Sequence, residues 1–133
     1  MRVQRIPEHR SRTYLKKAHE FLRAAEAARA RQDWNAAGLG AVHAGISAVD
    51  AVTTWTLGQR SRDVDHENAS QLLRRTDLAD ADERAEQFVR LIRDKNVIEY
   101  EARDYEGREA EAATNRAQRL VAWAQAVVTG TPR

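Results

Sequence analysis

The chain has 133 residues and a net charge of +2, which is the size of one domain and enough to bury about two-thirds of its unfolded surface. It contains no cysteine, so disulfide bonds, thiolate zinc sites and cysteine nucleophiles are excluded together. The histidines have no HExxH or HxxxH spacing, so we expect neither a metal nor another cofactor. No apolar run reaches the roughly eighteen residues of a membrane helix, and the N-terminus lacks an apolar segment, so we expect a cytoplasmic protein.

Charge is distributed unevenly along the chain. Residues 1–17 carry six basic side chains against a single acid, Glu8; the bases are Arg2, Arg5, Arg10, Arg12, Lys16 and Lys17. Such a segment can bind phosphates by releasing counterions, or it can be a solvated tail. We assign residues 1–11 to a basic N-terminal tail and residues 12–129 to a single helical domain.

The spacing of apolar residues predicts helices in chain order and no strand. A first helix covers residues 12–31, and a second begins after the capping residue Asp33 and ends at Gly58 in the left-handed conformation. A loop over residues 60–64 leads to a short helix, capped by Asp65, that runs through residue 75. A fourth helix covers residues 80–103, a break follows at residues 105–107, and a last helix covers residues 109–128. This order predicts an all-α fold, an antiparallel four-helix bundle with an additional short helix.

The second predicted helix is rich in small residues, and Asp50 carries its only full charge. Four polar side chains share one of its faces: His43, Ser47, Asp50 and Thr54. A helix that is apolar nearly all round belongs in a core, so its carboxylate must be paired, hydrogen-bonded or used. We expect Asp50 to pair with Arg93 or Lys95, or to share a functional pocket. The small residues would also suit a symmetric dimer contact.

The segment RDKNVIEY, residues 93–100, places Arg93, Val97 and Tyr100 on one helical face and Asp94 on the adjacent one. In its order of features the chain resembles the HEPN (higher eukaryotes and prokaryotes nucleotide-binding) superfamily from about residue 14 to about residue 126. The resemblance rests on WNAAGLGAVHAGISAVDA, DHENASQLL, RDKNVIEYEARDYE and EAATNRAQRLVAWAQ. It implies a small helical bundle, usually homodimeric, of a kind that includes many ribonucleases and toxins of toxin–antitoxin modules.

The resemblance also implies site residues. Active HEPN nucleases have an arginine, then Asn or Asp, and a histidine about five to seven residues further on, often followed by tyrosine. Arg93, Asp94 and Tyr100 fit this pattern, but Ile98, Glu99 and Tyr100 occupy the histidine positions. Metal-free RNA cleavage needs a base for the 2′-hydroxyl and a cation for the phosphate. Arg93 supplies the cation, whereas the loss of acid–base help typically costs about 10²-fold to 10⁴-fold in rate.

Two histidines elsewhere are candidates to replace the missing base. His43 lies on the central helix, where Asp50 is spaced to orient an imidazole. His66 follows Asp65 at the start of the short helix. Both also have structural interpretations, as a core or interface group for His43 and as a capping or surface residue for His66.

The favoured hypothesis is a homodimeric HEPN-type bundle that binds RNA or a nucleotide-like ligand in a cleft between protomers, without efficient cleavage. Arg93 would bind the anion, and Asp94 and Asp50 would hold it in place. Three further side chains would lie nearby: Lys95, Asn96 and Tyr100.

Two alternatives stay open. One is an active endoribonuclease toxin that uses His43 or His66 as the base. The other is a protein-interaction bundle that docks a nucleotidyltransferase or an antitoxin partner through the acidic surface around residues 80–86.

Overall fold

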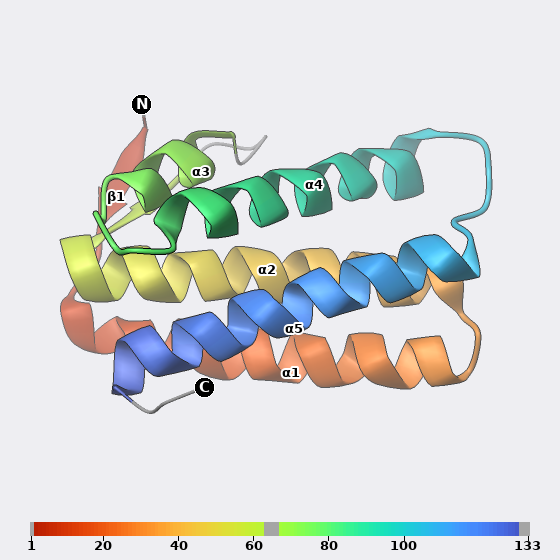
Figure 1. The fold of residues 1–133 in the computed structure, drawn as a ribbon, viewed down its shortest axis with the longest axis horizontal. Coiled ribbons are helices and arrows are strands. Elements are labelled where there is room, and N and C mark those ends of the chain that lie inside the picture. Colours follow the sequence, from red (N-terminus) through yellow and green to blue (C-terminus); the bar gives the residue numbers. More distant parts are fainter. Residues whose placement is uncertain (1, 63–66, 131–133) are drawn as a thin grey trace.

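The computed structural model describes residues 2–62 and 67–130, which form a bundle of long helices (Figure 1). In chain order, the elements are β1 (Val3–Arg5), the 3₁₀ turn η1 (Glu8–Arg10), α1 (Ser11–Ala30), α2 (Trp34–Leu57), β2 (Gln59–Ser61), α3 (Glu67–Arg74), α4 (Ala81–Tyr100) and α5 (Gly107–Thr129). The predicted fold class is confirmed, an antiparallel four-helix bundle with one additional short helix. The predicted bounds are close to those observed, except that α4 ends at Tyr100 and not at residue 103.

The two middle helices of the bundle are α2 and α5, with α1 and α4 flanking them on opposite sides (Figure 1). Within the described residues, α1 and α4 each contact both middle helices but not each other. Most side chains in the core are small or aliphatic, and Phe88, Leu91 and Tyr105 are among the largest that are fully buried. The small residues of α2 let its neighbours approach closely, which is why this helix can occupy the centre.

By length and composition alone, α2 is apolar enough to cross a membrane. However, 72% of its apolar stretch is buried inside the bundle. The core helix of a globular bundle has the same composition. The described residues therefore contain no clear membrane-spanning segment, and a cytoplasmic location stays a prediction.

The helix ends follow the predicted signals in part. Gly58 ends α2 at φ 66°, in the left-handed region that favours glycine. Asp33 precedes α2 as predicted, but its side chain makes no capping hydrogen bond and lies 3.2 Å from Nε of Arg31. A reciprocal capping box between Glu106 and Glu109 begins α5.

Two glycines of α2 allow close packing against the rest of the bundle. A Cβ atom on Gly38 would lie 2.6 Å from the Tyr105 ring and 2.7 Å from Cδ1 of Ile98. A Cβ atom on Gly45 would lie 2.7 Å from Cδ1 of Leu91. All three distances are shorter than a carbon–carbon contact allows. Gly38 is required for this packing because it faces a rigid aromatic ring, whereas the atom closest to Gly45 is the flexible end of a leucine side chain.

A small antiparallel sheet corrects the predictions for residues 1–11 and 60–64. β1 pairs with β2, with Val3 opposite Ser61 and Arg5 opposite Gln59. The backbone N–H of Ile6 also donates to the carbonyl oxygen of Gly58 at 2.9 Å. The basic segment is therefore not a solvated tail, and residues 60–64 are not entirely loop. Strands of three residues are too short to show an alternating pattern in the sequence.

Candidate functional site

The motif residues 93–100 form the C-terminal part of α4, and three of their polar side chains face solvent. Arg93 and Asn96 are exposed, as is Tyr100, with 76% of its surface accessible. In the part of the chain that the structure describes, no hydrogen bond or ion pair joins Arg93 to another residue. α4 therefore presents an arginine whose charge no carboxylate of residues 2–62 and 67–130 neutralises.

Asp94 lies against α5 and does not hold Arg93, so that prediction is wrong. Its Oδ2 atom is 3.8 Å from Nη1 of Arg116, and it is buried with no hydrogen-bond donor among the described residues. Burial raises the pKa of Asp94, and Glu109 adds to the rise. The Tyr105 hydroxyl and Arg116 oppose it. Because Asp94 and Arg93 are neighbours in the sequence, their side chains point to different faces of α4.

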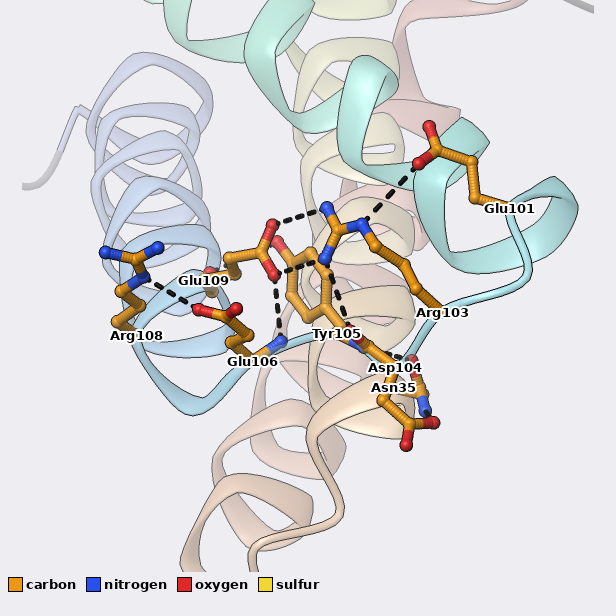
Figure 2. A network of polar contacts seen from close by, with 8 residues as sticks. All are labelled: Asn35, Glu101, Arg103, Asp104, Tyr105, Glu106, Arg108 and Glu109. Atoms are coloured by element: carbon orange, nitrogen blue, oxygen red, sulfur yellow. Dashed lines mark hydrogen bonds and ion pairs between the residues drawn. The ribbon is translucent and has the colours of Figure 1, made fainter.

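A network of polar contacts fastens the loop after α4 to the start of α5 (Figure 2). Nη1 and Nη2 of Arg103 donate to the two carboxylate oxygens of Glu109, both at 2.9 Å. Glu109 also accepts a hydrogen bond from the backbone N–H of Glu106 at 2.9 Å. These bonds, those from Arg103 first, lower the pKa of Glu109 to about 2. The network therefore holds the loop between α4 and α5 against the first turn of α5.

Tyr105 connects this network to α2. Its hydroxyl donates to the carbonyl oxygen of Glu109 at 3.1 Å, and its backbone N–H donates to Oδ1 of Asn35 at 3.0 Å. Burial, together with the negative charge of Asp94, raises the pKa of Tyr105, so the phenol keeps its proton at neutral pH. The sequence predicted only a helix break here. The Glu106-x-x-Glu109 spacing, which is that of a capping box, is the signal in the sequence that could have predicted this network.

A cavity of about 550 Å³ opens beside the network. Three basic and three acidic side chains line it: Arg103, Arg108, Arg116, Asp94, Glu106 and Glu109. Every arginine in that set faces an acid of the same set, at 2.9 Å, 2.8 Å and 3.8 Å respectively. Charges that already neutralise one another give little attraction to a charged ligand, so we interpret this region as a structural junction.

Asp50 pairs with a residue that the sequence placed in a loop. It is 5% exposed, and its Oδ2 atom lies 3.2 Å from Nη2 of Arg60 on β2. The predicted pairing with Arg93 or Lys95 is wrong; Nζ of Lys95 lies 3.1 Å from Glu99 on the next turn of α4. The requirement that a buried carboxylate be paired was correct, but the partner comes from a different element.

The Asp50 pair also contacts α1. The Arg60 guanidinium lies over the ring of Tyr14, 5.2 Å from its centroid, in cation–π geometry. Burial raises the pKa of Asp50 from 3.8 to about 6, although Arg60 and Lys17 oppose the rise. Desolvation therefore outweighs the attraction of the nearby cations.

His43, the candidate histidine that the structure describes, is not brought to the motif. His43 is half-buried, with its ring 5.5 Å from the ring of Phe21 on α1. Within residues 2–62 and 67–130, no hydrogen bond joins His43 to Ser47, Asp50 or the motif of α4. His66 lies outside the described residues. In those same residues, no three His, Asp or Glu side chains gather where they could share a metal ion.

The fold and these contacts define the class of the protein as an all-α bundle with an exposed arginine on α4 that has no partner among the described residues. No family model, curated protein or solved structure matches the chain. A function must therefore be argued from its surface and its sites.

Proposed function

We propose that this protein is a HEPN-like helical bundle that binds RNA or a nucleotide-like ligand through α4, as a catalytically degenerate relative of metal-independent endoribonucleases. One contrast within the motif carries the proposal. Asp94 and Lys95 face Arg116 and Glu99, whereas Arg93 is exposed and unpaired among the described residues. A phosphate approaching Arg93 meets a free guanidinium, which binds phosphate oxygens with two parallel hydrogen bonds.

The side chains around Arg93 suit the same ligand. Asn96 and Tyr100 are also exposed on the C-terminal half of α4. An amide can donate to a ribose or phosphate oxygen, and a tyrosine ring offers a face on which an unpaired base can stack. Lys95 contributes less, because Glu99 already accepts its charge at 3.1 Å.

Binding without efficient cleavage follows from the lack of a base at the motif. A base must come within hydrogen-bond reach of the proton that it removes. Ile98, Glu99 and Tyr100 stand where the resemblance expects a histidine. His43 contacts Phe21 on α1, His19 lies 2.8 Å from Gln125, and His9 lies in η1, so no histidine of the described residues is hydrogen-bonded to Arg93.

We further propose that two copies of the chain form the ligand cleft. Tyr100 exposes 76% of its surface on the single copy, which is unusual for a large aromatic side chain. Burial of this ring against a second copy would bring the two α4 surfaces together. A monomer in light scattering at working concentration would remove this part of the proposal.

The test is RNA binding measured with chelator present, on labelled structured and single-stranded RNA. Arg93→Ala should weaken binding about tenfold, and the slope of log affinity against log salt should fall by about 1. The control is Arg23→Ala, which removes another exposed arginine, from α1, a helix that does not contact α4 in the described residues. The control should bind like the wild type.

The other outcomes point to the alternatives. Cleavage that disappears with Arg93→Ala would favour an active ribonuclease, and His43→Ala and His66→Ala would then identify the base. An absence of both binding and cleavage would favour the protein-interaction bundle.

A further inference from the structure

A second candidate site lies where β1 and η1 fold onto the start of α1. Together they line an open cavity of about 380 Å³. Its walls are fixed by the backbone, because β1 pairs with β2 and the N–H of Arg10 donates to the carbonyl oxygen of Pro7 at 2.9 Å. The basic segment at the N-terminus therefore forms a shaped surface.

The charged side chains that line this cavity are all positive. They are Arg5 from β1, Arg10 from η1 and Lys17 from α1. Among residues 2–62 and 67–130, no ion pair joins any of the three to an acid. Lys17 instead lies 6.0 Å from the ring centroid of Tyr14. Lys17 lies close enough to the buried carboxyl of Asp50 to lower its pKa, but Arg5, Arg10 and Lys17 around one concavity still leave a positive potential that attracts anions.

The acids nearby do not cancel this charge. Glu8 is exposed and does not line the cavity. Asp50 is buried, and its carboxylate lies 3.2 Å from Arg60, whose guanidinium covers the ring of Tyr14. Asp50 interacts more strongly with Arg60 than with Lys17, so among the described residues the cavity keeps a net positive charge.

We infer that this cavity binds a phosphate monoester. A monoester carries a charge of about −1.5 to −2 and three acceptor oxygens on one group. Two guanidinium forks and one ammonium supply both the charge and the donors for such a group. A phosphodiester inside a nucleic-acid chain carries a single charge and would neutralise less of this set of cations than a monoester does. The ligand is thus a terminal phosphate, on a small phosphate ester or on the 5′ end of an RNA.

The site is separate from the surface around Arg93, because α1 does not contact α4 in the described residues. The proposal for this cavity and the proposal for Arg93 can therefore be refuted independently of each other. Arg93→Ala should not change binding at the cavity, and changes at the cavity should not change the contribution of Arg93.

The test uses calorimetry with 5′-AMP and adenosine, and fluorescence polarisation with a short 3′-labelled RNA carrying either a 5′-phosphate or a 5′-hydroxyl. Arg10→Ala should weaken binding of the phosphorylated probe about tenfold. Arg12→Ala is the matched control, an exposed arginine two residues further on that does not line the cavity. Lys17→Ala and Lys16→Ala form a second matched pair on the same helix.

Losses confined to Arg10→Ala and Lys17→Ala would support the site. Binding of 5′-AMP would identify a small phosphate ester as the ligand, and a preference for the 5′-phosphorylated RNA alone would identify an RNA end. Equal losses in both members of each pair would mean a diffuse basic surface and would overturn the inference. Equal affinity for the phosphorylated and unphosphorylated probes would overturn it as well.

Discussion

Replacement of Asp50 by asparagine tests the energetic cost of its burial. The pKa of this carboxyl is about 6 in the folded protein against 3.8 ordinarily, because burial disfavours the charged form. The folded chain therefore binds the proton more tightly than the unfolded chain. Protonation of Asp50 stabilises the fold at low pH, and this stabilisation is lost as the pH rises from about 4 through about 6. A carboxylate whose pKa an ion pair lowers behaves in the opposite way.

The size of the effect follows from the two pKa values. A difference of about 2 corresponds to about 3 kcal/mol at its limit. Between about pH 7 and about pH 4.5, about 2 kcal/mol of this difference in stability should be observed. Asparagine has the same shape and does not ionise. When the pH falls from about 7 to about 4.5, the free energy of unfolding of the wild type should rise by about 2 kcal/mol relative to that of Asp50→Asn.

The assay is urea unfolding at both pH values, followed by tryptophan fluorescence and by circular dichroism. Asp33→Asn is the matched control, because it removes a carboxylate of the same size from an exposed position beside α2. If the wild type and Asp50→Asn respond identically to pH, the Asp50–Arg60 pair offsets the desolvation fully and our reasoning is wrong. The subtraction also cancels the contributions of all other titrating groups.

Two further predictions concern the junction of α2, α4 and α5. Arg103→Ala should raise the pKa of Glu109 from about 2 toward 4.5, measured by NMR of the carboxyl carbon. Glu109 stabilises the fold above about pH 4.5, and this stabilisation is lost as the pH falls toward 2. If the pKa of Glu109 is unchanged in the variant, Arg103 is not the cause of its low value. Gly38→Ala should lower the free energy of unfolding by about 1–2 kcal/mol, because the added methyl meets the Tyr105 ring at 2.6 Å. Gly45→Ala should stay near the wild type in the same urea assay, since it meets only the flexible end of a leucine and gains helix propensity; equal losses in both variants would refute this distinction.

The long helices could be predicted from the sequence because their apolar spacing repeats over many turns. In α5, for example, Ala113, Ala117 and Leu120 recur at helical spacing, and all three are buried. The strands had no such signal, because each contributes three residues and its partner lies beyond two helices in the chain. The spacing of apolar residues therefore predicts a helix or strand only when that element is long.

The site could be predicted at the level of faces but not of partners. Spacing correctly separated Arg93 from Asp94 onto adjacent faces of one helix. It could not show that α5 covers the face of Asp94, because that depends on packing between distant segments. Likewise, the rule that a buried carboxylate needs a partner identified Asp50, but Arg60 became its partner only through β2.

The pairing of β1 with β2 also sets an order of events during folding. Val3 can meet Ser61 only after the hairpin of α1 and α2 has brought the two ends of this long segment together. Before that, closing the loop would cost chain entropy without compensating contacts. The cavity at the N-terminus is thus assembled after the first two helices dock, and it is lost when α1 separates from α2.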